Sequence, residues 1–182
     1  MPSAFAHGAL GASLASLLPR QQRVFWVATV FAFLAAAPDL DVVSFRLGIP
    51  YEHPLGHRGA SHSLFFAAVV SLISFPFWKR TLREQAPLAA ILTFVAIASH
   101  GILDAFTDAG LGIGLLIPFD NDRYFAPWRP ILTSPLSVSR FFSGNGLAIL
   151  ASEAFWVGVP ASVFFLLLAL FRRFSKSPGD AT

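Results

Sequence analysis

Apolar residues fall into five runs along the chain, and short polar or charged segments separate them. A helix needs about 17–25 apolar residues to cross a bilayer, and the longer runs approach or meet that length. The first run is shorter and rich in glycine and alanine, which indicates close packing against neighbouring helices. The pattern predicts an all-α, polytopic membrane helix bundle of about five helices, at residues 5–18, 24–44, 62–78, 87–106 and 147–171.

Composition agrees with a membrane protein. Of the 182 residues, 55% are hydrophobic and 13% are charged, whereas soluble domains carry about 25% charged residues. We expect a single membrane-embedded domain over residues 1–174, followed by a disordered tail at 175–182. Cysteine is absent, which excludes disulfides and thiolate metal sites.

The basic residues indicate how the chain crosses the membrane. Eight of the thirteen lie in short clusters after the first, third and fifth apolar runs, so the net charge of +3 reflects topology and predicts no nucleic-acid partner. Arg123, Arg129 and Arg140 lie in the long loop on the supposed outer side, but long loops weigh less in the positive-inside rule, and Asp120 and Asp122 partly balance them. By the positive-inside rule, the N-terminus is outside, and the C-terminus and its tail are cytoplasmic. The clusters are Arg20 and Arg23; Lys79, Arg80 and Arg83; and Arg172, Arg173 and Lys176.

This topology brings all five histidines and several aspartates to the outer face of the membrane. His100 and Asp104 are four residues apart, so they share one face of a helix, and Asp108 would follow one turn later. An imidazole and a carboxylate placed this way are common ligands of a divalent metal. A buried His–Asp hydrogen bond is the alternative reading of the same spacing.

Four further residues are candidate ligands at the same membrane level, namely His7, Asp39, His57 and His62. Asp39 and Asp41 would point to different faces of a helix, so one can bind a metal while the other orients a histidine. His57 and His62 flank a loop–helix junction, where Ser61 is a candidate N-cap. The alternatives to metal binding are that His7 is a histidine packed between helices and that His57 is simply exposed.

Glu153 lies about two turns inside the last apolar run, where a carboxylate needs a partner. Three roles are open for Glu153: metal ligand, general base, or partner in a hydrogen bond to another helix. The last is slightly favoured. Arg58, Arg123 and Arg129 are candidates for binding a phosphate, since a guanidinium is a bidentate donor. Arginines at the headgroup level can equally contact lipid.

The segment at residues 107–145 is too long for an ordinary connection, and its prolines and aromatic residues favour an ordered functional loop. A donor set of imidazoles and carboxylates suits zinc, with manganese as the alternative, in one or more ions. Water on such a metal is a nucleophile at neutral pH.

With these residues placed, the sequence resembles the YdjM-like family of inner-membrane, metal-dependent hydrolases. The matching segments are His7, PDLD at 38–41, HRGASHS at 57–63, HGILD at 100–104 and IPFDNDRYFAPWRPILTSP at 117–135. The family is distantly similar to zinc-dependent phospholipase C and single-strand nucleases. The resemblance implies a bacterial inner-membrane location, zinc and phosphoester hydrolysis.

We therefore expect a metal-dependent phosphodiesterase of the hydrolase class, acting on a phospholipid or another lipid-linked phosphoester at the outer face of the inner membrane. The metal ligands would be His7, Asp39, His57, His62, His100 and Asp104, and the catalytic residues Asp41, Glu153, Arg58, Arg123 and Arg129. The alternative is a non-enzymatic metal or proton transporter, or a structural membrane protein with a His/Asp cluster.

Overall fold

The computed structural model describes residues 1–19 and 25–174. Arg20, Arg23, Lys176 and the expected disordered tail lie outside these residues. The helical elements are α1 (Ala4–Leu14), η1 (Ala15–Leu17), α2 (Phe25–Ala36), η3 (Ala37–Val42), α3 (Val43–Arg46), η4 (Ala60–His62), α4 (Leu64–Leu82), η5 (Arg83–Gln85), α5 (Ala86–Ala105), α6 (Val138–Ser143), α7 (Gly146–Glu153), η6 (Ala154–Gly158) and α8 (Val159–Phe174).

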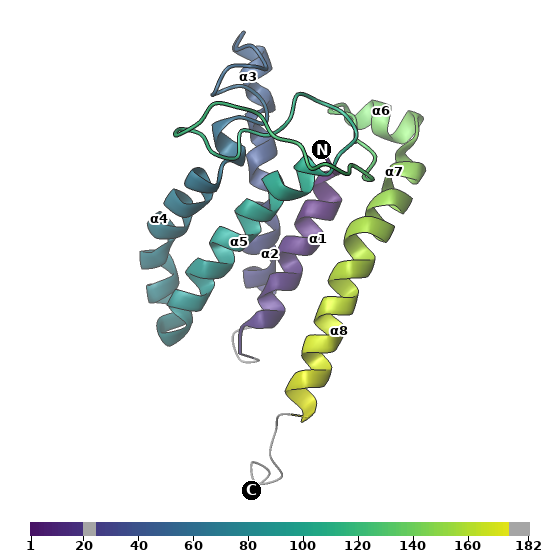
Figure 1. Cartoon of the computed structure of the whole chain (residues 1–182). Helices are drawn as coiled ribbons and strands as arrows, with labels where there is room; N and C mark the ends of the chain where they lie inside the picture. Colours follow the sequence, from purple (N-terminus) through teal and green to yellow (C-terminus); the bar gives the residue numbers. More distant parts are fainter. Residues whose placement is uncertain (20–24, 175–182) are drawn as a thin grey trace, which may run out of the picture.

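The described residues form the all-α bundle that the sequence predicts. Helices α1, α2, α4 and α5 run up and down beside one another, and α8 lies along α1 (Figure 1). Over residues 1–19 and 25–174 the backbone contains no strand, only isolated bridges between Thr107 and Ile131 and between Ile113 and Tyr124. The long loop and the N-terminus gather at one end of the bundle, and the chain ends of α4 and α8 lie at the other.

Three helical stretches are long and apolar enough to cross a membrane, judged by length and composition, at Phe25–Arg46, Leu64–Ala105 and Gly146–Phe174. The second contains two helices, α4 and α5, which fold back on each other at η5 (Figure 1). Each of them spans about 28–30 Å at 1.5 Å per residue, which matches the hydrocarbon thickness of a bilayer.

Several predicted boundaries were wrong by a few residues, with consequences for the site. His62 does not begin the third helix; it ends the 3-10 turn η4, and Ser63, not Ser61, caps α4 by accepting from Phe66 N at 3.0 Å. Because α5 ends at Ala105, Asp108 does not extend its polar face. Instead Asp108 Oδ1 accepts from Thr133 N and Oγ1 within the loop.

The loop after α5 is ordered and covers one end of the bundle. Its backbone is anchored to the elements below it, because Leu115 O accepts from Leu64 N at 3.0 Å and Ala126 N donates to Ala105 O at 2.9 Å. The last part of the expected loop is helical, as α6. The peptide bond between Ile117 and Pro118 is cis.

The apolar core lies between α1, α2, α4 and α5, with Phe31 and Trp78 fully buried at its centre. The single polar atom of the Trp78 ring is satisfied, because Nε1 donates to Thr93 Oγ1 at 2.9 Å across to α5. Small residues allow α1 to approach α2 closely. A Cβ atom at Gly11 would lie 2.3 Å from Phe31 O, whereas one at Gly8 would lie 3.8 Å from Ala32 O.

This difference predicts opposite effects of the same substitution on one helix. Gly11→Ala forces α1 away from α2 and is expected to destabilise the protein by about 1–3 kcal/mol, the usual cost of overpacking. Gly8→Ala fits the available space and is expected to be neutral or slightly stabilising, since alanine favours helix. Thermal unfolding of both variants in detergent is the measurement; equal midpoints would contradict the close α1–α2 contact.

Candidate metal centre

Four side chains from three separate elements meet beneath the loop. Asp39 comes from η3, His62 from η4, and His100 and Asp104 from α5. One potential ligand atom of each lies within 4.8 Å of those of the other three. The two histidines and Asp104 are fully buried, and Asp39 is nearly so. Residues more than sixty positions apart in the sequence therefore share one pocket.

The distances place both imidazole Nε2 atoms against carboxylate oxygens. His100 Nε2 lies 3.2 Å from Asp39 Oδ1, and His62 Nε2 lies 3.7 Å from both Asp39 Oδ1 and Asp104 Oδ2. None of these pairs forms a hydrogen bond by distance and angle, since all the atoms named are buried without a hydrogen-bond partner among the described residues. The atoms face a common centre.

Local backbone geometry explains why the side chains of Asp39 and Asp41 point in different directions. Pro38 lies in the first turn of the 3-10 helix η3, and a helix of about three residues per turn sends side chains two positions apart to different sides. Asp39 points to the centre, and Asp41 points to the segment at residues 57–62, where its Oδ2 accepts from Ser61 Oγ at 2.6 Å and from Arg58 N at 3.0 Å. In α5, the four-residue spacing puts His100 and Asp104 on one face.

Both histidines are oriented through their Nδ1 atoms. His100 Nδ1 lies 2.7 Å from Ala35 O, a carbonyl that can only accept, so Nδ1 carries the proton and Nε2 keeps its lone pair. His62 Nδ1 lies 3.1 Å from Asp41 Oδ2 and 3.0 Å from Ser61 Oγ. An imidazole held in this way by an oxygen acceptor is typical of metal-ligating histidines.

Of the eleven buried side-chain polar atoms without a hydrogen-bond partner among the described residues, nine converge on this one place. Burying a polar group without a hydrogen bond costs roughly 1–3 kcal/mol or more, so such a group of atoms requires compensation. A dication fits, because two carboxylates balance its charge and two Nε2 atoms complete an N and O donor set. The atoms are His62 Nε2, His100 Nε2, both carboxylate oxygens of Asp39 and of Asp104, both ring nitrogens of His7, and Arg58 Nε.

His62 is the one of the four that lies outside the candidate spans. Burial lowers the pKa of His62, but the carboxylates of Asp39 and Asp41 act against burial and raise the pKa to about 9. Because a ligand nitrogen must be unprotonated, a metal ion would bind here by displacing a proton.

Two further predicted residues border the cluster. His7 Nε2 lies 3.3 Å from Asp104 Oδ1, and its ring stacks on that of His100 with 3.7 Å between centroids. Arg58 is buried, its Nε lies 3.3 Å from Asp104 Oδ2, and its guanidinium donates to Ala109 O at 2.8 Å and Thr107 Oγ1 at 3.1 Å. Arg58 thus joins the cluster to the loop above it.

The other predicted site residues contribute no atom to the group of four, although Asp41 contacts His62 from outside it. His57 Nδ1 contacts Asp41 Oδ1 at 2.5 Å, so both belong to the surroundings of His62. Arg123 donates to the backbone oxygens of Tyr51 and His57, at 2.7 and 3.0 Å, and fixes the loop. Arg129 is exposed and stacks on Phe125.

Glu153 lies in α7, on the far side of α1 from the cluster, and its carboxylate accepts from Ser3 N and Ser3 Oγ. Because Ser3 is the N-cap residue of α1, this contact agrees with the hydrogen bond to another helix that the sequence slightly favours. Sequence reasoning missed Ser3, the Ala35 carbonyl and Thr107 as partners of site residues. A backbone carbonyl leaves no signal in a sequence, and small hydroxyl residues are too common to carry one.

A cavity of about 220 Å³ lies above the cluster, between the loop and the residues that surround His62. Arg58, His57 and Tyr51 line it from below, and Ala109, Gly110 and Ser134 belong to the loop side. Gly110 has a φ of +105°, and a Cβ there would lie 2.3 Å from Arg58 Nη1, so only glycine leaves room for the guanidinium. The cavity gives a small polar group access to Arg58.

Comparisons with known proteins agree with the membrane fold. The model of the family described as YdjM inner membrane protein matches residues 1–177. The inner membrane protein YbcI of Escherichia coli strain K12 is 35% identical over 178 residues, which cover 95% of this chain and all of that protein. No solved structure matches the chain.

Proposed function

The chain belongs to the YdjM inner membrane protein family, and from this premise we propose that it is a metal-dependent hydrolase. Its substrate is a phospholipid or another lipid-linked phosphoester at the outer face of the bacterial inner membrane. The single observation that carries the proposal is the convergence of unpartnered buried donor atoms from Asp39, His62, His100 and Asp104.

These four residues would hold the metal, zinc or alternatively manganese, and His7 Nε2 is a fifth donor beside Asp104. When bound, such an ion lowers the pKa of a coordinated water and supplies a hydroxide nucleophile at neutral pH. The carbonyl of Ala35 and the carboxylate of Asp41 hold the imidazoles in the tautomer that binds. Arg58 fixes Asp104 and presents its guanidinium to the cavity above.

The position of the cluster in the bundle supports a lipid-linked substrate. It lies at the loop end, where the loop exposes Phe119, Tyr124 and Trp128. Aromatic residues of this kind gather at the membrane–water interface, at the depth of the headgroups. The basic residues that end α4 and α8 are at the opposite end of the bundle, which by the positive-inside rule supports an outer-face position for the cluster.

The arginine beside the cluster supports an anionic substrate. A guanidinium is permanently charged and donates in a planar fork that matches phosphate oxygens. Two N–H groups of Arg58 are used on Ala109 and Thr107, and its contact with Asp104 orients the plane. A transporter would instead need polar groups along a path through the membrane; within the described residues the buried ionisable groups cluster at one end.

The test is elemental analysis of the purified protein, followed by a hydrolysis screen against phospholipids in mixed micelles. We expect bound zinc or manganese, phosphoester cleavage, loss of both after treatment with a chelator, and recovery when the metal is restored. Bound metal with no cleavage of any phospholipid, together with metal uptake into vesicles, would favour transport and overturn the proposal. A protein that binds no metal would also overturn it and favour a structural cluster.

A further inference from the structure

The continuous helical stretch formed by α7, η6 and α8 is joined to the N-terminal stretch formed by α1 and η1 by polar contacts at both ends. At the loop end, Glu153 accepts from Ser3 Oγ at 2.7 Å. At the opposite end, Arg172 Nη1 donates to Ser16 O at 2.9 Å and Nη2 to Leu17 O at 3.2 Å. Between these contacts Val157 is buried and Phe165 packs against the core, but α8 itself has no buried residue, so most of its length is exposed.

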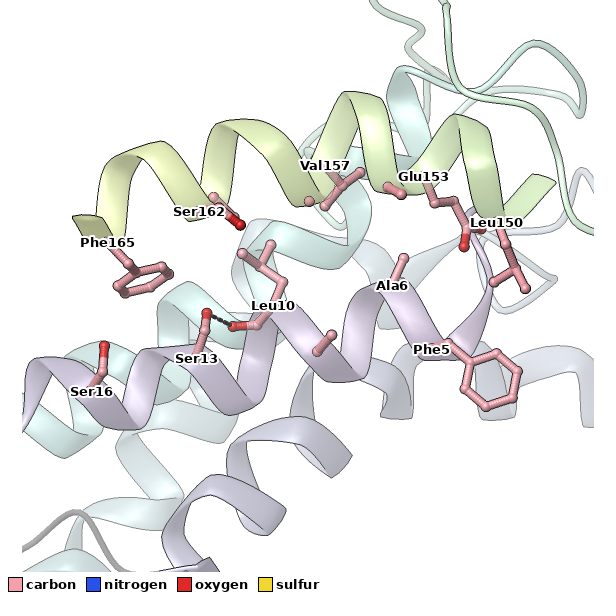
Figure 2. Close-up of a pocket in the computed structure, with 14 residues that line it drawn as sticks. Phe5, Ala6, Leu10, Ser13, Ser16, Leu150, Glu153, Val157, Ser162 and Phe165 are labelled. Carbon is pink, nitrogen blue, oxygen red and sulfur yellow. Dashed lines mark hydrogen bonds between the residues drawn. The ribbon is translucent and has the colours of Figure 1, made fainter. Parts of the chain in front are cut away.

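An apolar groove of about 580 Å³ occupies the space between the two helices (Figure 2). It arises because the facing residues are small, with Ala6 and Ala9 on α1 and Gly158 and Ala161 on the other side. The volume falls within the range of about 300–1,000 Å³ that is usual for ligand sites. Larger apolar side chains complete its walls, among them Phe5, Leu10, Leu150, Val157 and Phe165.

The groove lies at the depth of the bilayer hydrocarbon, since the stretch Gly146–Phe174 is one of the candidate spans. Only 6% of an apolar 18-residue segment of this stretch is buried within the protein. An apolar groove open to hydrocarbon is filled by hydrocarbon, because a void forfeits dispersion contacts and water has no polar partners there. From Ser3 to Ser16, α1 rises about 20 Å, comparable to the roughly 15 Å of hydrocarbon in one leaflet.

The charges at the two ends of the groove differ in sign. Glu153 is at the loop end, where a phosphate would be repelled. Arg172 is at the other end, where two contacts to η1 leave further N–H donors free, and Arg173 is exposed next to it. Ser16 Oγ, which lines the groove near Arg172, is buried without a hydrogen-bond partner among the described residues.

We propose that this groove binds one acyl chain of a phospholipid, with the phosphate at Arg172 and Arg173 and the chain end toward Glu153. The lipid belongs to the leaflet at the basic end of the bundle. It is not the substrate of the metal centre, because α1 separates the two: His7 is buried toward the cluster, and Ala6 and Ala9 line the groove. The inference does not rest on the proposed hydrolysis.

The test uses the full-length protein in bilayer discs of phosphatidylethanolamine and phosphatidylglycerol. Photoreactive phosphatidylglycerol carries a diazirine either near the glycerol or near the chain end, and mass spectrometry locates the adducts. We expect the first probe to label the groove near Ser16 and Phe165, and the second to label it near Leu10 and Leu150. The opposite order would overturn the proposed orientation.

A matched pair of double variants tests the groove itself. Ala9→Phe with Ala161→Phe fills the space and is expected to remove the groove adducts, whereas Ala148→Phe with Ala169→Phe adds the same rings at exposed positions and is expected to retain them. Adducts spread evenly over exposed α8 residues such as Phe164 and Leu166, and unchanged in the filled variant, would overturn the proposal. Cross-links from the groove to a second copy of the chain would do the same.

Discussion

Replacing His100 by alanine is expected to abolish hydrolysis and to weaken metal binding by about 100-fold or more. The four clustered side chains share the binding energy, which for structural zinc sites is about 10–16 kcal/mol, so removing one ligand of four costs at least about 3 kcal/mol. His100 is buried, and its Nε2 faces Asp39 Oδ1 at 3.2 Å. Metal content after dialysis against trace metal and the rate of phosphoester cleavage are the two readouts.

The matched control is His53→Ala. His53 is an exposed loop histidine whose Nδ1 accepts from Leu55 N, and it lies outside the cluster. It is expected to keep both metal and activity. Full activity of the His100→Ala variant would refute the assignment of the site, and so would equal metal loss in both variants.

Replacing Arg58 by methionine is expected to destabilise the metal-free protein by about 3–5 kcal/mol, because it leaves the buried Asp104 carboxylate without its cationic partner. In metal-loaded protein the loss should be smaller, since the ion then neutralises the same carboxylate. Denaturant titrations in detergent, followed by tryptophan fluorescence with and without chelator, measure the two values.

Arg129→Met serves as the control for that comparison. Arg129 is exposed and stacks on Phe125, an arrangement worth about 0.5–1 kcal/mol. Its effect should be small and independent of metal. If Arg58→Met costs the same with and without chelator, then no cation reaches Asp104 in the folded protein.

The sequence carried enough information to find the cluster because its ligands obey local rules. His100 and Asp104 are one turn apart on a helix, and Asp39 and His62 lie where apolar runs end or begin at the same membrane level. Hydrophobic run length and basic clusters are strong signals in membrane proteins, since each is set by the thickness and charge of the bilayer. These two signals are enough to predict the number of helices and to bring the four side chains to one end of the bundle.

What could not be predicted depends on side-chain direction at irregular backbone. His57 was expected beside His62 as a ligand, but between them the chain turns at Gly59 and forms η4, so the His57 ring faces Asp41. Which of Asp39 and Asp41 faces the centre depends on the 3-10 geometry of η3. Pro38 in its first turn allows this backbone conformation but does not require it.

The arginines of the loop illustrate the same limit. Arg123 was expected to bind substrate, but its guanidinium is occupied by the backbone oxygens of Tyr51 and His57. Which backbone carbonyls lack a partner within a helix, and so can accept from an arginine, cannot be predicted from the pattern of residue types. Arg58, by contrast, was predicted on the same ground as Arg123, and the fold brings it to Asp104.

The order of the ligands along the chain has a consequence for biosynthesis. His7, Asp39, His62, His100 and Asp104 all precede the covering loop and α8. A nascent chain that has released α5 from the ribosome already holds every donor, while the lid over them is still being translated. If the cluster binds metal as proposed, its donor set is therefore complete before the covering loop and the last helix are added.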